Sequence, residues 1–327
     1  MRDLHELPKL RDGLSYLYLE HGKLDRAESA IEFWDKESGR TLIPVAALAV
    51  LMLGPGTSIT HEAVKVAADN GCLILWCGEE GVRFYAQGMG ETRKAYHLLR
   101  QAQLASDTAQ RMQVVLRMYR HRFGDDLDPT LSLEQIRGYE GVRVREAYAE
   151  ASRTYGVPWN GRRYDRGNWG AADPINRALS AASSCLNGIC HAAIVSGGYS
   201  PALGFIHTGR QLSFVYDVAD LYKVDLTVPT AFHIVAESAQ QVETRARHAC
   251  RAIFREVKLL DRVLADIDRV LGIKEDDLAR GEAADSDPAL PAPWWSPSDE
   301  IGGEGDGGDG FGESLGITAR GVDALAG

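Results

Sequence analysis

The spacing of apolar residues changes near residue 91, and this change constrains the fold more than any other feature of the sequence. Up to that point, short segments of β-branched and aromatic residues are separated by turn signals such as Ser38-Gly39, a pattern typical of strands. One helix is predicted among them, with Thr60 as its N-cap and Gly71 as its stop. The predicted strands are residues 15–20, 31–34, 41–45, 73–77 and 82–86.

Beyond residue 91, apolar residues recur every three or four positions as far as residue 271, which is the period of an α-helix. The predicted helices are residues 96–121, 133–155, 174–196, 213–223, 228–237 and 242–271. We therefore expect an α+β protein. A small N-terminal β-rich domain with one helix should occupy residues 1–90, and a larger all-α domain should occupy residues 91–274.

Residues 275–327 differ in composition from both regions. They are rich first in proline and then in glycine and acidic residues, which is typical of a flexible tail. Trp294 and Trp295 lie in the proline-rich part. Two exposed tryptophans would suggest a docking segment, and a disordered tail without a docking role is the alternative.

The composition is that of a soluble globular protein, since 45% of the 327 residues are hydrophobic and 25% are charged. The apolar run at residues 43–53 is too short to cross a membrane. The N-terminal residues lack the apolar core of a signal peptide, so we expect a cytoplasmic protein. Five cysteines without a CxxC spacing predict reduced, buried thiols rather than a zinc site.

The formal charge of −10 is unevenly distributed along the chain. Residues 275–327 hold 13 acidic and 2 basic residues, which leaves 34 basic against 33 acidic residues before them. The first basic cluster, in which Asp107 is the single acid, is Arg93, Lys94, Arg100, Arg111, Arg117, Arg120 and Arg122. The second is Arg137, Arg143, Arg145, Arg153, Arg162, Arg163, Arg166 and Arg177. Such clusters indicate binding to a nucleic-acid backbone, and solvated helix surfaces are the alternative.

The segment at residues 204–223 combines His207 with Asp217 and Asp220. If residues 213–222 are helical, the two aspartates share a helix face, with Cβ atoms roughly 5–6 Å apart. Their neighbours on the helix are mostly apolar, so the paired carboxylates call for a positive partner. A divalent cation would fit, because oxygen ligands suit magnesium or manganese and an imidazole suits manganese. The alternative is a pair of acids that favour the positive end of the helix dipole.

Glu140 lies between two glycines, Gly138 and Gly141, inside a predicted helix. Each glycine costs about 1 kcal/mol relative to alanine in a helix interior. The pair therefore suggests that backbone or substrate approaches closely beside Glu140. The alternative is a surface glutamate that pairs with Arg137 or Arg143.

Several segments together resemble one protein family, CRISPR-associated protein 1 of the type I-E subgroup. The matching segments are IPVAALAVLMLGPGTSITHEAV, RGYEGVRVREAYA, YGVPWNGRRYD, GFIHTGRQLSFVYDVADLYK and VPTAFHIVA. They lie within residues 10–270, and the last three are highly specific in combination. The resemblance implies an N-terminal β domain and a C-terminal helical catalytic domain, in agreement with the apolar spacing.

The resemblance also implies a metal-dependent DNA endonuclease and integrase. Glu140, His207 and Asp220 would bind Mg²⁺ or Mn²⁺, and Asp217 would be a further acid required for activity. A 3′-hydroxyl of incoming DNA would attack a phosphodiester of the CRISPR repeat, with the metal polarising the phosphoryl oxygen. Asp217 could hold a second ion or orient His207, because carboxylates commonly fix a ligating imidazole.

Partners follow from the same resemblance. We expect homodimers that flank a dimer of CRISPR-associated protein 2 in a heterohexamer, holding a DNA duplex with single-stranded 3′ ends. Ser58 stands where relatives often carry arginine, and His21 stands where they often carry a tyrosine that splays the DNA strands. The expected DNA contacts are His21, Lys65, Arg83, Arg137, Arg162, Arg163, Arg210, Tyr216 and Lys223. A non-catalytic DNA-binding scaffold and a stand-alone structure-selective nuclease are the alternative functions.

Overall fold

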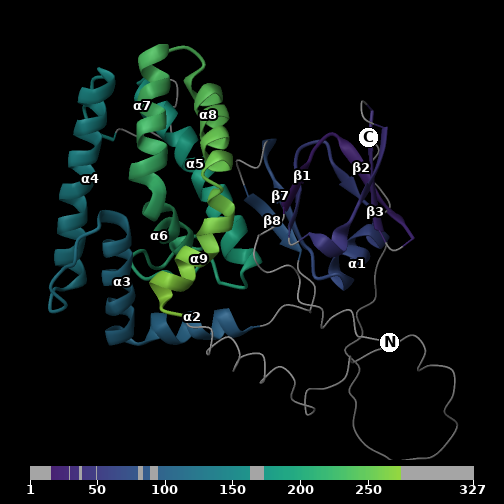
Figure 1. Ribbon diagram of the computed structural model, residues 1–327, viewed down its shortest axis with the longest axis horizontal. Coiled ribbons are helices and arrows are strands. Elements are labelled where there is room, and N and C mark those ends of the chain that lie inside the picture. The colour runs from purple at the N-terminus through teal and green to yellow at the C-terminus, as the bar shows by residue number, and fades with distance from the viewer. Residues whose placement is uncertain are drawn as a thin grey trace, which may run out of the picture. The chain divides into compact units, whose positions relative to one another are not determined.

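The computed structural model describes residues 16–28, 30–36, 39–48, 50–79, 84–88, 95–162 and 173–273. Within them, a region of strands with one α-helix is followed by a region of helices (Figure 1). The predicted α+β class is therefore confirmed. The tail predicted at residues 275–327, with its two tryptophans, lies outside the described residues, and the domain boundaries at residues 90 and 274 stay predictions.

The described strands form two sheets of four strands each. The first has the order β1-β5-β7-β8, in which β8 alone is antiparallel to its neighbour. Its strands are Tyr16–Leu19, Val50–Leu53, Leu73–Cys77 and Phe84–Gly88. The second has the order β4-β3-β2-β6. Its strands are Gly39–Ile43, Ala30–Asp35, Gly22–Ala27 and Ser58–Ile59.

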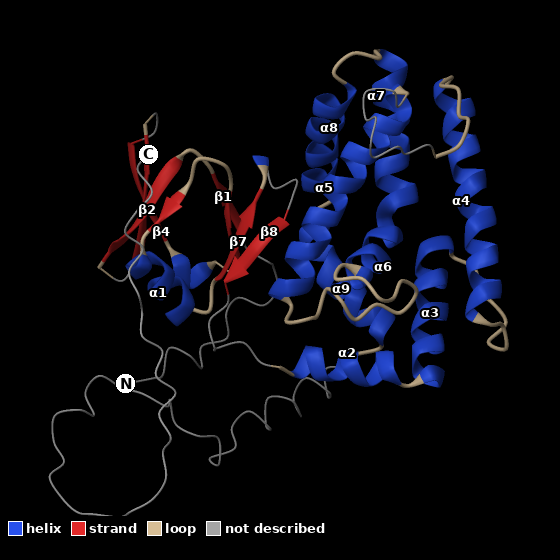
Figure 2. Ribbon diagram, turned by 180° about the vertical axis from the view of Figure 1, so that it is seen from behind, coloured by secondary structure: helices blue, strands red, loops and turns tan. Residues whose placement is uncertain are grey.

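Helix α1 (His61–Asp69) packs against strands of both sheets (Figure 2). It begins at Thr60, whose hydroxyl accepts a hydrogen bond from the backbone N–H of Ala63, so the predicted N-cap is confirmed. Ala63 and Ala67 are fully buried, and they share one core with Ile31 of the second sheet and Leu51 of the first. Small side chains on this face allow the helix to lie close to the strands.

The apolar run at residues 43–53 contains β5, a strand that the sequence analysis missed together with β2 and β6. All four β5 residues are buried, because one face of the first sheet packs on the α1 core. The other face packs on helix α5 (Pro174–Ser196), where Val50 and Met52 contact a cluster that includes Ala192 and Val195. A strand buried on both faces shows no alternation of apolar and polar residues, and periodicity therefore could not identify it.

The helical region is built around α5, which packs against the helices that follow it in sequence. Its helices other than α5 are α2 (Tyr96–Ser106), α3 (Thr108–Phe123), α4 (Leu133–Tyr155), α6 (Ser213–Tyr222), α7 (Val228–Glu237), α8 (Val242–Glu256) and α9 (Leu259–Leu271). A π-helical segment, Lys223–Thr227, joins α6 to α7. A 3-10 turn, Val45–Ala47, precedes β5.

Helix α5 has the length and apolar composition of a membrane-spanning segment, which the sequence analysis did not recognise. However, 72% of its apolar window is buried inside the protein. A core helix of a soluble protein passes the same test of length and composition. The burial accounts for the apolar character of α5 without a membrane.

Two predicted helices are each divided in two. The prediction at residues 96–121 is interrupted at Asp107, which has an extended backbone and caps α3 by accepting a hydrogen bond from Gln110 N at 2.8 Å. The prediction at residues 242–271 is interrupted at Lys258, whose backbone is left-handed at φ 48°. Apolar spacing continues across both breaks, so the period alone gave no sign of them. The bounds predicted for α4, α5 and α7 are confirmed.

Candidate active site

The loop before α6 is held by one buried carboxylate. Asp217 accepts hydrogen bonds from the backbone N–H groups of Phe205 at 2.5 Å, Ile206 at 3.0 Å and His207 at 2.8 Å. Gly204 lies at the start of this turn, where an added Cβ would be 2.1 Å from the carbonyl oxygen of His207. The turn therefore requires glycine at position 204 and an acceptor with two oxygens at position 217.

Asp217 also orients the imidazole of His207. The Nδ1 atom of His207 lies 2.7 Å from Oδ1 of Asp217. Because an ionised carboxylate only accepts hydrogen bonds, Nδ1 carries the proton and Nε2 of the neutral ring keeps its lone pair. The side chain of Asp217 is fully buried, whereas that of His207 is 43% exposed. Of the two roles considered for Asp217, this geometry corresponds to orienting His207.

The surroundings of His207 act on the pKa of its imidazole in opposite directions, and the net effect raises it. The hydrogen bond to Asp217 is the largest influence raising its pKa above the usual value, and burial opposes it. The charges of Asp217, Asp220 and Glu140 raise the pKa further. All three acids are therefore close enough to His207 to act on its charge.

Glu140 and Asp220 meet at one small cavity. Glu140 lies on α4 and Asp220 on α6, and both line a hollow of about 10 Å³ together with Asp217. This volume holds about one water-sized sphere. Each of the two acids is engaged by a cation: Nη1 of Arg122 donates to Glu140, and Nζ of Lys223 donates to Asp220.

The donor atoms around the cavity suit a divalent metal in type. Carboxylate oxygens are preferred by magnesium and manganese, and an imidazole nitrogen suits manganese. Among the described residues, however, no three His, Cys, Asp or Glu side chains are grouped so that they could hold one ion. Glu140 and Asp220 would first have to leave Arg122 and Lys223. The residues thus fit a metal in the type of donor atom, while in this arrangement Glu140 and Asp220 are paired with cations.

The glycines beside Glu140 face open space. Among the described residues, a Cβ added to Gly138 would meet nothing within 4 Å, and one added to Gly141 would meet only Nη1 of Arg145 at 3.5 Å. The expectation that the chain's own backbone approaches here is therefore wrong, while the approach of a substrate stays a prediction. The suggested pairing of Glu140 with Arg137 or Arg143 is also wrong, because Arg122 occupies this role.

Arg122 is the residue of the site that sequence reasoning missed, since it entered only as one member of a basic cluster. Its side chain is 5% exposed. Its inward orientation could have been inferred from its position on α3, four residues after Met118 and three after Tyr119, both of which are buried. An arginine at that spacing lies on the inward face of the helix.

Most other expected DNA contacts in the helical region lie near this loop. Arg137 donates to the carbonyl oxygen of Ile206, and the ring of Tyr216 meets that of His207 edge-on at 5.9 Å between centroids. Arg210 is exposed and follows the loop. Arg162, also exposed, donates to the carbonyl oxygen of Asn176 at 3.1 Å.

The remaining expected contacts belong to the β-rich region or lie outside the described residues. His21 is exposed at a turn with φ 57°, and Lys65 is exposed on α1. Ser58, where an arginine was expected from the resemblance, is exposed on β6. Arg83 and Arg163 lie outside the described residues.

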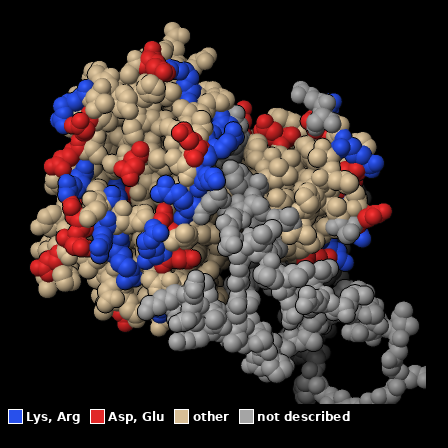
Figure 3. All heavy atoms as spheres, in the orientation of Figure 1, with Lys and Arg blue, Asp and Glu red and all other residues tan. Residues whose placement is uncertain are grey.

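The basic clusters are less exposed than their sequences suggested. Arg111 donates to the carbonyl oxygen of Phe205 at 2.8 Å, and Arg117 donates to that of Val270 at 2.6 Å. Arg177 forms two hydrogen bonds of 3.1 Å with Glu243. Partners distant in sequence thus satisfy several arginines, and on the face shown in Figure 3 basic and acidic side chains are interspersed.

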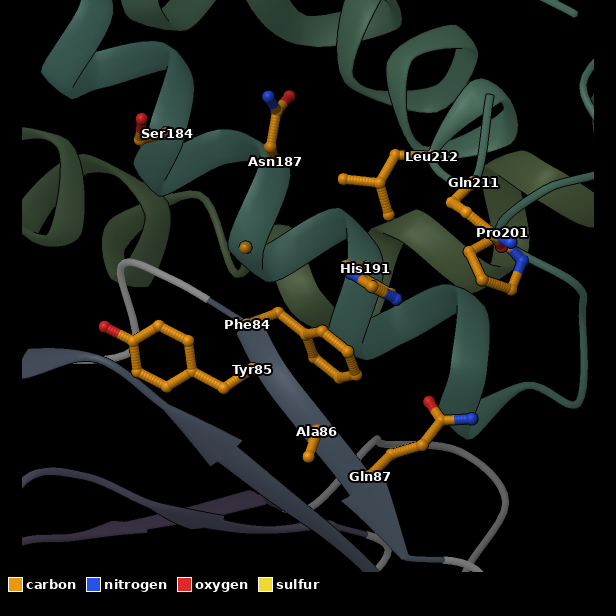
Figure 4. A pocket seen from close by; sticks show the side chains of 11 residues that line it. Phe84, Tyr85, Ala86, Gln87, Ser184, Asn187, His191, Pro201, Gln211 and Leu212 are labelled. Atoms are coloured by element: carbon orange, nitrogen blue, oxygen red, sulfur yellow. The ribbon is translucent and has the colours of Figure 1, made fainter. Parts of the chain in front are cut away.

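A larger hollow of about 570 Å³ lies between β8 and α5 (Figure 4). The rings of Phe84 and His191 face each other there, with centroids 3.7 Å apart. Burial lowers the pKa of His191 to about 4, so its imidazole is neutral at neutral pH. The described lining contains no Asp, Glu, Lys or Arg. The described part of this hollow therefore offers no charged side chain for a metal or a phosphate.

Comparison with known proteins places the chain in a family. The family model described as CRISPR associated protein Cas1 matches residues 16–124 and 117–252. A Thermus thermophilus protein named CRISPR-associated endonuclease Cas1 2 is 55% identical over 316 residues, which cover 95% of this chain and 96% of that protein. The Escherichia coli protein named CRISPR-associated endonuclease Cas1 is 46% identical over 272 residues, covering 83% of this chain and 89% of that protein.

A solved structure agrees with these identities. The crystal structure described as that of a TtCas1-DNA complex matches with a TM-score of 0.74 and 58% identity, covering 81% of this chain and 99% of that chain. Both the sequence and the fold of the described regions thus match over most of the chain. The chain belongs to the CRISPR associated protein Cas1 family.

Proposed function

We propose that this chain is a divalent-metal-dependent DNA endonuclease and integrase of CRISPR adaptation, which inserts short DNA fragments into the CRISPR array. The observation that carries the proposal is the pairing of Asp217 with His207 beside the two acids, Glu140 and Asp220, of one cavity. Relatives named CRISPR-associated endonucleases support the nuclease activity. The relative solved in complex with DNA supports the substrate class.

Glu140, His207 and Asp220 would hold a magnesium or manganese ion. Such an ion, when bound, polarises a phosphoryl oxygen and lowers the pKa of the attacking hydroxyl. Asp217 keeps the proton of His207 on Nδ1, which presents the Nε2 lone pair to a ligand. The same carboxylate holds the backbone at residues 205–207, so the imidazole is positioned by the turn as well as by its own hydrogen bond.

The reaction is an exchange of phosphodiester bonds. The 3′-hydroxyl oxygen of the incoming DNA bonds to phosphorus, and the bond from phosphorus to a 3′ oxygen of the CRISPR repeat breaks. The proton lost by the attacking hydroxyl is balanced by the proton gained by the departing one. With water as the attacking group, the same site would hydrolyse DNA. Arg210 and Lys223, which flank the loop and the cavity, are suited to neutralise the phosphate charge.

The proposed assembly is a homodimer that joins CRISPR-associated protein 2 in a heterohexamer in the cytoplasm. The assembly would hold a duplex with single-stranded 3′ ends against the repeat DNA. Exposed apolar side chains on the second sheet support a role of the β-rich region in assembly: Leu42 of β4 is 64% exposed, and Trp34 of β3 is 48% exposed. These residues lie on adjacent strands and on one face of the sheet.

Strand transfer tests the proposal directly. The protein, with and without CRISPR-associated protein 2, is incubated with a short duplex and a supercoiled CRISPR plasmid in Mg²⁺ or Mn²⁺. We expect Glu140→Ala and His207→Ala to abolish joining, whereas Asp225→Ala, at an exposed position of the π-helical segment, should join like the unmodified protein. Unchanged joining by Glu140→Ala or His207→Ala would show that the metal-site assignment is wrong. DNA binding without any cleavage or joining would favour the scaffold alternative.

A further inference from the structure

Arg122 occupies an unusual position for an arginine. Its side chain is 5% exposed, and its guanidinium carbon lies 4.9 Å from the centroid of the Phe123 ring. Nη1 donates to Glu140, while Nε is buried without a hydrogen-bond partner among the described residues. In the described part of the chain, a single carboxylate thus serves as the ion-pair partner of this buried cation.

An arginine side chain stays charged in proteins, so Arg122 keeps its positive charge when it loses a partner. Removing one partner of a buried ion pair is strongly unfavourable, since it leaves an uncompensated charge away from water. If Glu140 turns to a metal, Arg122 therefore loses its partner and at the same time faces a new positive charge. Metal binding at this cavity requires a replacement anion for Arg122.

The anion that the proposed reaction brings to the cavity is a DNA phosphate. A planar guanidinium matches the geometry of phosphate oxygens and can donate two parallel hydrogen bonds to them. Arg122 already lines the cavity that Glu140, Asp217 and Asp220 share, and α4 presents open space beside Gly138. A phosphate is larger than the one water-sized sphere that the cavity holds, so it would take the space that Glu140 leaves beside α4 and would meet the guanidinium there.

Building on the function proposed above, we propose that Arg122 couples the binding of metal to the binding of DNA. Without DNA, Arg122 holds Glu140 and weakens metal binding. With DNA, the guanidinium exchanges Glu140 for a phosphate, and the carboxylate becomes free for the metal. Lys223, whose side chain is 29% exposed, plays the same part for Asp220, with which it is paired. The protein then loads its metal efficiently only when DNA is present.

The coupling role and a purely structural role of Arg122 predict opposite changes in metal affinity when the arginine is removed. An arginine that only positions Glu140 would, when removed, loosen the ligand and weaken metal binding. An arginine that competes for Glu140 would, when removed, strengthen it. We therefore expect Arg122→Gln to bind Mn²⁺ in the absence of DNA at least about fivefold more tightly than the unmodified protein, the lower end of typical coupling factors.

The experiment measures Mn²⁺ affinity by electron paramagnetic resonance, with and without a short duplex bearing single-stranded 3′ ends. A titration of the duplex alone corrects for Mn²⁺ bound to its phosphates. In the unmodified protein, DNA should tighten Mn²⁺ binding by about 5–150-fold, the usual range for coupled sites. In Arg122→Gln this factor should be smaller, because Mn²⁺ no longer has to displace the guanidinium from Glu140. By reciprocity, Mn²⁺ should also tighten DNA binding less in the variant, as measured by fluorescence anisotropy.

Two further variants complete the design. Arg245→Gln removes an arginine that pairs with Glu237 away from the cavity, and it should leave Mn²⁺ affinity unchanged. Lys223→Gln releases Asp220 without altering the buried arginine, so it replaces Arg122→Gln if that protein does not fold, and it should tighten Mn²⁺ binding in the same way. Weaker or unchanged Mn²⁺ binding in the folded variants overturns the coupling role. Failure of the unmodified protein to bind Mn²⁺ with or without DNA would instead count against the proposed metal site.

Discussion

Replacing Asp217 with asparagine is the sharpest test of how the site is built. The carboxylate accepts four hydrogen bonds, three from backbone N–H groups and one from His207 Nδ1. Asparagine has the same shape but offers one oxygen and one NH₂ group. The NH₂ group would face two donors, whichever way the amide is turned. With the NH₂ group at the Oδ1 position, the backbone N–H of His207 is left without an acceptor, and the His207 ring must change its tautomer to accept a hydrogen bond. With the amide turned the other way, the backbone N–H groups of Phe205 and Ile206 both lose their acceptor, which costs more.

The loss of stability in Asp217→Asn can be worked out from these hydrogen bonds. A hydrogen bond to a charged group contributes about 1.5–3 kcal/mol, and a buried donor left unpaired costs about 1–3 kcal/mol. Because asparagine is neutral, the variant no longer has to bury a charge, and this gain offsets part of the loss. We therefore expect Asp217→Asn to lower the free energy of unfolding by about 3–5 kcal/mol, the range for breaking a buried charged pair. Domains are typically stable by about 5–15 kcal/mol, so the variant should remain folded.

The change of tautomer has a second consequence. With Nδ1 accepting from the new amide, the proton moves to Nε2, and His207 loses the lone pair that faces a ligand. Mn²⁺ affinity should therefore fall by about 10–100-fold, as is usual when the partner of a ligating histidine is removed. This loss is expected even though Asp217 itself is not assigned as a ligand.

Urea unfolding followed by circular dichroism measures the first effect, and Mn²⁺ titration measures the second. Asp225→Asn is the matched control, because Asp225 is exposed on the π-helical segment after the same helix; it should change stability by less than about 0.5 kcal/mol. A loss of stability in Asp217→Asn no larger than in this control would refute the role of Asp217 in holding the turn. Unchanged Mn²⁺ affinity in a destabilised variant would refute the orientation of His207.

Three further predictions concern other positions. Gly204→Ala should destabilise the protein by about 1–3 kcal/mol in urea, because its Cβ would be 2.1 Å from the His207 carbonyl oxygen, and a neutral effect would contradict the tight turn. Gly138→Ala should instead stabilise by about 1 kcal/mol in the same assay, since its Cβ meets nothing within 4 Å in the described part of the chain, and a loss of stability would mean that the helix is packed there. Burial lowers the pKa of His191 from 6.5 to about 4, so the unfolded chain binds the proton first and stability should fall as the pH drops from 6.5 to 4, by up to about 3 kcal/mol. His191→Phe should remove this part of the acid sensitivity in pH-dependent urea unfolding, and an unchanged pH profile would contradict the assignment.

Helices were predictable where one face is buried and the other is exposed. The bounds of α4 follow from Ser132, which caps the helix together with Gln135, and from Gly156, which ends it in a left-handed conformation. Strand β5 was not predictable, because burial on both faces removes the alternation on which the prediction depends. The break at Lys258 was hidden for a different reason, since a left-handed lysine carries no distinctive sequence signal.

The sequence was sufficient to predict which acids and which histidine form the site, but not which residues they contact. His207, Asp217 and Asp220 lie within fourteen residues of one another, and local spacing was sufficient to group them. The partner of Glu140 depends instead on how α3 packs beside α4, which no local pattern encodes. The alternative considered for Glu140 was a pairing with Arg137 or Arg143, which are near it in the chain, whereas the observed partner, Arg122, lies eighteen residues away.

The charges of the cavity explain why metal and DNA should depend on each other. Glu140, Asp217 and Asp220 contribute three negative charges, and Arg122 and Lys223 contribute two positive ones. With His207 neutral, the group therefore carries a net charge of −1, which repels a phosphodiester. A bound divalent cation would change this charge to +1, which attracts one. Because opposite charges attract strongly in a partly buried site, each of the two ligands should favour the binding of the other, and Arg122 and Lys223 set how much metal is bound before DNA arrives.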